Sequence, residues 1–320
     1  MYLSKTAVLS AALLWLNAAP VVAGTAAADA VTAEPATTGT SSTSVSALLT
    51  QVHQCSATLQ LRSAALTDSQ ESQICQQLSE VEQRFQHIFE NPSPVSYDGN
   101  HMLRANIYAS QPQYAAYAGQ HFLMPTNNGG MYLEGLPHQA GNQAEFVAYQ
   151  HAGGAVWNLA HEYVHYLDGR FNLFGDFCAN LHDSHAAPEN CPRPAPQSPY
   201  LVWWTEGMAE YLAHGDNNQA AIKLAKEAGF ALSALFHTGY ESNSGSDRIY
   251  RWGYLAVRYM FEKQRNKLDQ MLQFTRNGDY PRYQALVLSW GSSMDEDFAL
   301  WLQQLATASS ATTKPTATSP

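Results

Sequence analysis

Residues 155–171 read AVWNLAHEYVHYLDGRF and contain the pattern His-Glu-x-x-His. On a helix, His161 and His165 lie one turn apart and project from the same face. Two imidazoles so placed can bind one zinc ion at about 2.0–2.1 Å each. Glu162 lies next round the helix, where its carboxylate can take a proton from a metal-bound water. The alternative is a surface helix with two unrelated histidines, but the mostly apolar neighbours predict a buried helix instead.

A catalytic zinc site needs a third protein ligand and an open position for water. The segment LVWWTEGMAEY (201–211) supplies the candidate, because Glu206 begins a predicted helix that can pack beside the first. Glu210 follows one turn later on the same face, where it can hydrogen-bond a ligand imidazole from outside the metal sphere. Alternatively, Glu206 is an acidic residue near a helix N-terminus that stabilises the helix dipole.

The stretches HEYVHYLDGRF and WWTEGMAEY together resemble the peptidase domain of secreted bacterial collagenases, which are gluzincin zinc metallopeptidases. A third stretch, TNNGGMYLE (126–134), agrees with this resemblance. It implies that Gly129 and Gly130 bind substrate on an edge strand above the zinc, and that Glu134 is a calcium ligand. Glycines do let a peptide backbone approach closely, and an edge strand can pair with a substrate strand. The alternative for the glycine pair is an ordinary Asn-Gly turn.

The oxyanion of the transition state needs a hydrogen-bond donor besides the metal. Gluzincins commonly place a tyrosine on a later helix for this role, often three residues before a glycine. Tyr250 matches that spacing in IYRWGY (249–254), and Tyr254 is the second choice. Alternatively, both are core tyrosines among the 17 in the chain.

Four cysteines occur in the sequence, an even number that is typical of exported proteins with two disulfides. Three pairings are possible, and we expect Cys55–Cys75 and Cys178–Cys191 because short loops close at the lowest entropy cost. The alternative is four free, buried thiols. The polar stretch LHDSH (181–185) could bind a second metal ion, but we expect a solvated loop.

The composition of the 320-residue chain predicts a protein with a sizeable core, because 45% of its residues are hydrophobic. Its net charge of −10 argues against a nucleic-acid partner. Residues 1–23 have the pattern of a secretory signal peptide, with an uncleaved membrane anchor as the alternative. Residues 24–44 form an Ala/Thr/Ser-rich segment that predicts a flexible linker, and 307–320 a disordered tail of similar composition. We therefore expect a secreted protein without a membrane contact after signal cleavage.

The order of hydrophobic patterns predicts an α+β fold, with a small mixed sheet, the HExxH helix and a mainly helical C-terminal half. The resemblance implies that this fold is thermolysin-like. We expect one zinc peptidase domain over 45–306, and its parts are a helical hairpin (45–90), the sheet with the active-site helix (91–168) and a helical subdomain (169–306). Within it, strands are expected over 101–109 and 130–133 and helices over 143–150 and 155–167, and the break near Thr67-Asp68 is a helix-cap signal.

The function that follows is a secreted zinc-dependent endopeptidase, collagenase-like, with one catalytic zinc ion and, by the resemblance, a calcium ion. We expect a monomer that acts on a protein or peptide substrate. The activator and binding modules of large collagenases are not expected here, so gelatin-like or general peptides are safer substrates than native collagen. One alternative is a zinc aminopeptidase, although residues 129–132 read GGMY rather than the GxMEN-type motif. The other is a non-catalytic, zinc-stabilised matrix-binding module.

Overall fold

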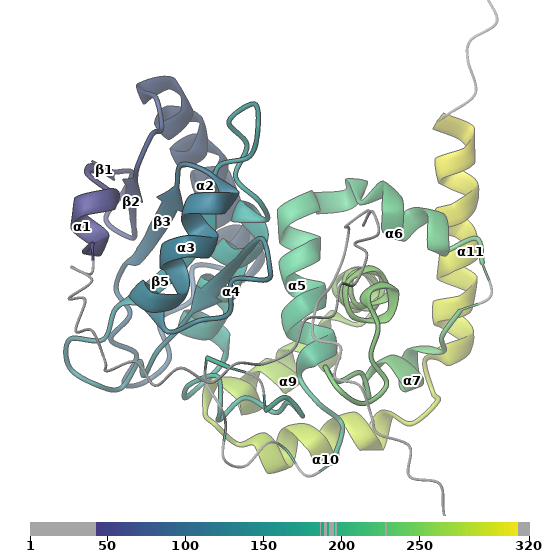
Figure 1. The fold of residues 1–320 in the computed structure, drawn as a ribbon. Helices are drawn as coiled ribbons and strands as arrows, with labels where there is room; N and C mark the ends of the chain where they lie inside the picture. Colours follow the sequence, from purple (N-terminus) through teal and green to yellow (C-terminus); the bar gives the residue numbers. More distant parts are fainter. Residues whose placement is uncertain are drawn as a thin grey trace, which may run out of the picture.

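The computed structural model describes residues 43–312, apart from 186, 189, 190, 192–194, 196 and 228. The predicted signal peptide (1–23) and the predicted linker up to residue 42 lie outside the described residues. What is described divides into a half that contains the sheet and a half built of helices (Figure 1). An α+β chain with a small mixed sheet and a mainly helical C-terminal half is therefore confirmed.

The sheet has five strands in the order β1-β2-β3-β5-β4. The strands are β1 (Gln51–Gln54), β2 (Leu59–Ser63), β3 (Leu103–Tyr108), β4 (Gly130–Leu133) and β5 (Ala144–Tyr149). The central pairs β2–β3 and β3–β5 are parallel, whereas the outer pairs β1–β2 and β4–β5 are antiparallel. Among the described residues, this order places β4 at an edge of the sheet, where β5 is the strand paired with it.

Helices cover both faces of the sheet (Figure 1). These helices are α1 (Val45–Leu48), α2 (Asp68–Ile88), α3 (Gln111–Phe122) and α4 (Leu159–Asn172). On one face, Tyr108 and Val147 pack in a cluster with residues of α1 and α3. On the other, alternate strand residues such as Leu61 and Phe146 join the main core with α2 and α4. Alternation along the strands therefore sends side chains into two separate cores.

The C-terminal half consists of helices that continue the main core. They are α5 (Val202–His214), η1 (Gly215–Asn217), α6 (Gln219–Leu224), α7 (Leu232–Leu235), η2 (Asp247–Trp252), α8 (Gly253–Lys263), α9 (Arg265–Arg276), α10 (Tyr280–Trp290) and α11 (Asp295–Thr312). Helix α5 packs between α4 and α8. A Cβ at Gly207 would lie 2.4 Å from the Gly253 carbonyl oxygen, so glycine is what allows α5 and α8 to approach this closely.

Two predicted elements are wrong. The helical hairpin over 45–90 is instead a short helix, the strands β1 and β2, and then α2. Leu59 and Leu61 are two residues apart, which is the spacing of one face of a strand, and both are buried against β3. The helix over 143–150 is the strand β5, whose aromatic and β-branched residues favour a strand between two neighbours. By contrast, Thr67 caps α2 as the sequence indicated.

Two boundaries also differ from the prediction. Helix α4 begins at Leu159, because Asn158 has a left-handed backbone with φ of 48°, and it continues to Asn172. The active-site helix therefore extends into the segment predicted as the start of the helical subdomain. Helix α11 runs to Thr312, past residue 306, so the predicted tail starts too early. The remainder of that tail, 313–320, lies outside the described residues.

Both predicted disulfides are present. Cys55–Cys75 ties the turn after β1 to α2, and Cys178–Cys191 closes the loop that follows α4. Their Cα–Cα distances are 5.2 and 5.3 Å, which is ordinary disulfide geometry. The alternative of four free thiols is excluded.

Removal of the Cys55–Cys75 crosslink by a double serine substitution is expected to lower the free energy of unfolding by about 3 kcal/mol. The crosslink joins residues 20 positions apart, and losing it lets the unfolded chain explore more conformations. Urea denaturation followed by circular dichroism measures the change. A difference below about 1 kcal/mol would contradict the expectation.

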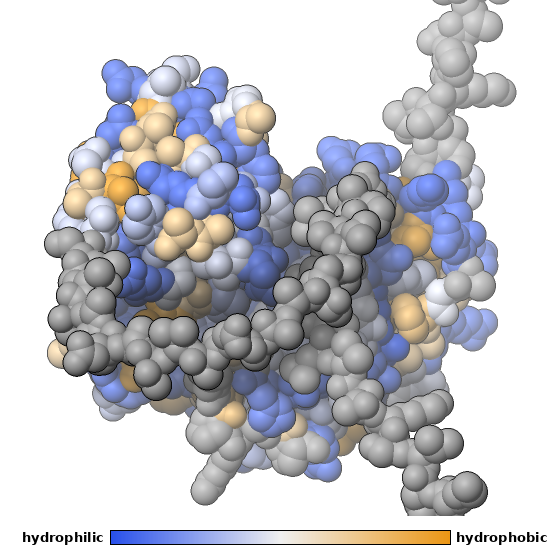
Figure 2. Space-filling model, in the orientation of Figure 1, coloured by the Kyte–Doolittle hydropathy of each residue, from blue (hydrophilic) through white to orange (hydrophobic). Residues whose placement is uncertain are grey.

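The surface seen in Figure 2 is mostly hydrophilic on both halves, and apolar residues form small separate groups. Among the large apolar side chains, Leu123 is 82% exposed and Val52 63%. Within the described residues, none of the helices combines the length and hydrophobicity needed to cross a membrane.

Candidate metal centre

Helix α4 presents His161 and His165 side by side, as the spacing predicted. Their Nε2 atoms lie 3.0 Å apart and their ring planes are nearly perpendicular. The helix is held in place by buried Leu159, Val164 and Leu167 on its other sides. The HExxH pattern thus has the helical geometry that brings two imidazole nitrogens to one point.

Glu206 reaches the same point from α5. Its Oε2 atom lies 3.2 Å from His161 Nε2 and 3.6 Å from His165 Nε2. Glu206 is 6% exposed, so its carboxylate faces the interior between the two helices. If Glu206 only stabilised the dipole of α5, its carboxylate would not need to contact the two imidazoles.

The arrangement of these three donor atoms fits a metal ion. All three lie within 4.8 Å of one another, and donors around a tetrahedral zinc ion would be about 3.3 Å apart. Burial by itself lowers the pKa of His161, but hydrogen bonds to Glu206 and Glu210 outweigh this effect and raise that pKa to about 10. The site therefore favours positive charge at its centre, and the group His161, His165 and Glu206 could hold a metal ion.

Glu210 lies behind His161, as predicted for a residue that orients a ligand. The His161 Nδ1–H group donates to Glu210 Oε1 at 3.0 Å, which directs Nε2 toward the centre of the site. Asn218 Nδ2 donates to the other oxygen of Glu210 at 2.9 Å. Asn218 thus helps to fix the carboxylate that orients the His161 imidazole.

Glu162 is buried beside the three donors but does not belong to their group. Its Oε2 atom accepts the backbone N–H of Tyr132 at 3.0 Å. Because Tyr132 is in β4, this contact places the carboxylate beside the edge strand of the sheet. Burial raises the pKa of the Glu162 carboxyl, which suits a group that must accept a proton and then release it.

Of the two candidate tyrosines, Tyr250 faces the site. Its ring centroid lies 5.9 Å from that of His161, from the π-helical segment η2. Burial raises its pKa, and the carboxylates of Glu206, Glu162 and Glu210 raise it further, so the hydroxyl keeps its proton. The Tyr254 hydroxyl instead donates to the Gly215 carbonyl at 2.9 Å. The second choice therefore points away from the site.

Gly129 and Gly130 lie where β4 begins, after a bend at 127–129. A Cβ at Gly129 would lie 2.6 Å from the Trp157 ring, and one at Gly130 would lie 2.9 Å from Ala148 Cβ. Both positions therefore need glycine for internal packing, whatever the strand edge binds. Glu134 follows β4 and is buried, and its carboxylate lies against Gly169 of α4.

The stretch LHDSH is not the solvated loop that we expected. His182 and Asp183 are buried, and His182 stacks on Phe177 with centroids 4.2 Å apart. The Asp183 carboxylate accepts backbone N–H groups from Tyr240 and Ser242 at 2.7 Å each. Within the part of the chain that the structure describes, neither residue belongs to a group that could share a metal ion. These contacts attach the loop of His182 to Phe177 and the carboxylate of Asp183 to the segment 240–242.

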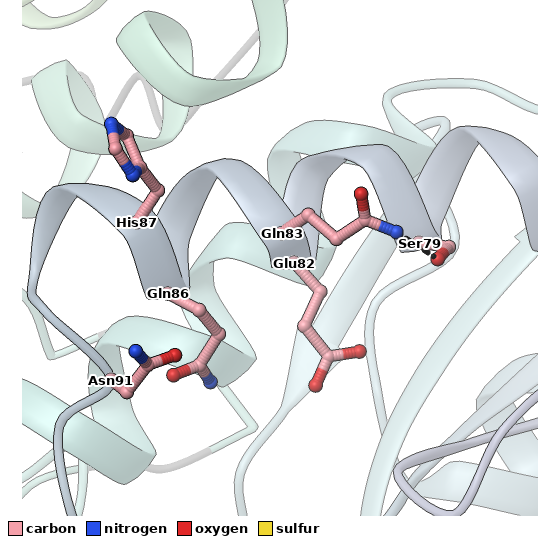
Figure 3. A pocket seen from close by; sticks show the side chains of 6 residues that line it. All are labelled: Ser79, Glu82, Gln83, Gln86, His87 and Asn91. Carbon is pink, nitrogen blue, oxygen red and sulfur yellow. Dashed lines mark hydrogen bonds between the residues drawn. The ribbon is translucent and has the colours of Figure 1, made fainter.

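Figure 3 shows the side chains that line a polar surface hollow along α2. Its volume is about 450 Å³, and it is lined by Ser79, Glu82, Gln83, Gln86, His87 and Asn91. Glu82 is already engaged, because it accepts hydrogen bonds from Thr58 and Tyr163. This hollow contains none of the residues that the sequence predicted for the site.

Tyr240 and Asn218 are contacts of the site that the sequence did not indicate. The Tyr240 hydroxyl donates to Glu206 Oε1 at 2.6 Å, and Asn218 supports Glu210. Tyr240 lies in a loop and Asn218 caps α6, so neither residue has a fixed spacing from the HExxH motif. Only the tertiary structure could reveal them.

A family model described as Collagenase matches residues 3–301 of this sequence. The chain therefore belongs to the collagenase family of peptidases, as the motifs around the three donors predicted.

The similar proteins are much longer than this chain. It is 41% identical over 264 residues to a microbial collagenase of Vibrio alginolyticus, across 81% of this chain and 30% of the relative. Identity to a microbial collagenase of Vibrio parahaemolyticus is 38% over 256 residues, across 79% and 29% respectively. Collagenase ColT of Clostridium tetani is 24% identical over 242 residues, across 71% and 22%. The chain thus spans less than a third of the length of each.

Proposed function

We propose that this chain is a secreted zinc-dependent endopeptidase of collagenase type, which hydrolyses gelatin, collagen-type or other extracellular proteins. The observation that carries the proposal is the convergence of His161, His165 and Glu206, with Glu162 beside them but outside the donor group. Two histidines and one glutamate are a donor set that catalytic zinc sites use. The third donor, Glu206, comes from α5, the helix that follows the HExxH helix, and the edge strand β4 contacts Glu162. Both features support a thermolysin-like gluzincin arrangement.

In this proposal His161, His165 and Glu206 would hold the zinc ion. When bound, zinc lowers the pKa of a water toward about 7 and polarises the scissile carbonyl. Glu162 would take a proton from the attacking water and pass it to the leaving amine. The Tyr250 hydroxyl would donate a hydrogen bond to the developing oxyanion. Gly129 and Gly130 would let a substrate strand approach the edge strand β4 and pair with it.

A calcium ion near Glu134 is part of the same proposal. Burial raises the pKa of Asp168 to about 6, and its Oδ2 atom has no hydrogen-bond partner among the described residues. Glu134 and Asp168 both lie close enough to Tyr280 to raise the pKa of its hydroxyl, which burial raises most. A second cation would neutralise these two buried carboxylates. Isothermal titration of the zinc-loaded protein with calcium tests this site.

A parallel digest tests the proposed activity. Gelatin, native collagen and an N-terminally blocked peptide are incubated with the protein, with and without a zinc chelator. We expect chelator-sensitive cleavage of gelatin and of the blocked peptide. An aminopeptidase would leave the blocked peptide intact, and a matrix-binding module would contain zinc but cleave none of the three.

Replacement of Tyr250 by Phe is expected to lower kcat by roughly 10²–10³-fold and to leave the zinc content unchanged, because one oxyanion donor is lost. Steady-state kinetics on the blocked peptide and metal analysis measure both quantities. Tyr254→Phe is the matched control, since that hydroxyl binds the Gly215 carbonyl instead. Equal losses in the two variants would show that neither tyrosine acts on the oxyanion.

Secretion, a single peptidase domain that begins near residue 45 and a monomeric state are also proposals. Sequencing the N-terminus of the exported protein locates signal cleavage, which we expect after residue 23. Light scattering of the purified protein gives its mass in solution.

A further inference from the structure

The third donor, Glu206, has one oxygen at the metal site and a second that is bound elsewhere. Its Oε2 atom faces the two imidazoles, whereas its Oε1 atom accepts a hydrogen bond from the Tyr240 hydroxyl at 2.6 Å. This hydrogen bond occupies one lone pair of Oε1 and fixes the carboxylate so that Oε2 faces the imidazoles. Such a contact favours one ligand atom from Glu206 and leaves room for water in the fourth position.

Tyr240 is itself held by a buried carboxylate from a distant part of the chain. Asp183 accepts the backbone N–H of Tyr240 at 2.7 Å and that of Ser242 at 2.7 Å. It also accepts the Glu241 N–H at 3.3 Å. A Cβ at Gly239 would lie 2.4 Å from Asp183 Oδ2, so the turn can wrap the carboxylate only with glycine there. The position of the Tyr240 backbone is therefore set by Asp183.

The segment that carries Asp183 is in turn attached to the helix that carries Glu206. The backbone N–H of Leu201 donates to the Leu181 carbonyl at 2.7 Å, directly before α5 begins. The Cys178–Cys191 disulfide closes the same loop, and His182 stacks on Phe177 within it. Asp183, Tyr240 and Glu206 thus form one connected unit.

We propose that Tyr240 and Asp183 are positioning residues for the metal ligand Glu206, with Asp183 acting through Tyr240. This inference rests on the proposed zinc site. Tyr240 orients the carboxylate by its hydrogen bond, and Asp183 fixes the turn that delivers the hydroxyl. Outer partners of this kind orient ligands and commonly set metal affinity.

The first test is the full chain with Tyr240→Phe, which removes only the hydroxyl. We expect zinc affinity, measured by competition with a chromogenic chelator, to fall by about 10–100-fold. With cobalt in place of zinc, the visible absorption bands should shift, because the Glu206 carboxylate is free to turn. Unchanged affinity together with an unchanged cobalt spectrum would overturn the proposal.

A matched control separates a local effect from a general one. Tyr259→Phe also removes a hydroxyl that donates to a carboxylate, that of Asp297 at 2.8 Å, but on helices outside the site. It should leave zinc affinity and the cobalt spectrum as in the parent chain. An equal loss of affinity in both variants would mean that the effect is one of stability, which would also overturn the proposal.

A double-mutant cycle on zinc affinity tests whether Asp183 acts on the metal site through Tyr240. Asp183→Asn alone should weaken zinc binding, and adding it to Tyr240→Phe should weaken it by less than the product of the two single effects. Fully independent effects would overturn the proposed route through Tyr240. If Asp183→Asn does not fold, by near-ultraviolet circular dichroism, Gly239→Ala replaces it, since its Cβ would displace the same turn.

The experiments distinguish failure of the proposed zinc peptidase function from failure of the positioning roles alone. If the unchanged chain bound no stoichiometric zinc, the proposed function would fall, and the positioning roles with it. If the unchanged chain bound zinc and cleaved peptides while Tyr240→Phe behaved identically, only the positioning roles would fall.

Discussion

Replacement of Glu162 by Gln is expected to reduce kcat by roughly 10²–10⁴-fold while zinc stays bound. The amide cannot accept the proton of the attacking water, yet it keeps the size of the carboxylate and an oxygen that can accept the Tyr132 N–H. Because burial already disfavours the charged form of Glu162, the neutral amide should not destabilise the fold. Hydrolysis of the blocked peptide and the zinc content of the purified variant are the two measurements.

For this variant, the loss of peptidase activity is compared with any loss of bound zinc. Glu296→Gln, an exposed residue of α11, makes the same chemical change far from the donors and should leave both quantities unaltered. A Glu162→Gln protein that still cleaves peptides at the parent rate would refute the role of Glu162 as general base. A variant that loses zinc as well would instead indicate that Glu162 supports the metal.

Replacement of Glu206 by Gln should have the second large effect, which is loss of the metal itself. The carboxylate supplies the negative charge that faces two imidazoles at 3.2 and 3.6 Å, and a neutral amide is a poor substitute at a zinc site. We expect zinc affinity to fall by more than the ~10–100-fold that loss of an outer partner causes. Activity should fall in parallel at limiting zinc.

Excess zinc distinguishes this effect from that of Glu162→Gln. A weakened metal site should recover part of its activity as free zinc rises, whereas a missing general base should not. Thermal unfolding of the metal-free proteins shows whether the fold survives, which it should, because the amide fills the same volume between α4 and α5. Retention of zinc at parental affinity by Glu206→Gln would mean that another side chain is the third ligand.

Together, Glu162→Gln and Glu206→Gln test proton transfer and metal binding separately. His161, His165 and Glu206 concentrate donor atoms at one point, and the proposed role of Glu162 is to move a proton beside that point. The edge strand links these tasks, because the Tyr132 N–H that contacts Glu162 belongs to β4, where a substrate strand would be added. In the proposed arrangement, a substrate strand paired with β4 would lie beside Glu162.

Local patterns in the sequence were enough to predict the helix-borne part of the site. Residues four apart on one helix face must converge, so His161 and His165 could be paired without knowing the fold. The need of a catalytic zinc site for a third ligand singled out Glu206, and the structure brings its carboxylate to the same point. Patterns were less reliable for short strands: β2 and β5 are each six residues or fewer, so the periodicity of their apolar residues is too short to separate a strand from a helix.

What the sequence determined by itself is therefore the local chemistry: the HExxH helix, the cap of α2 and the short disulfide loops. These depend on interactions between residues close along the chain. The tertiary structure alone decided that Tyr250 rather than Tyr254 faces His161, and that Tyr240 and Asp183 lie behind Glu206. Such contacts join residues tens of positions apart, and their geometry is set by how helices and loops pack, which no spacing in the sequence encodes.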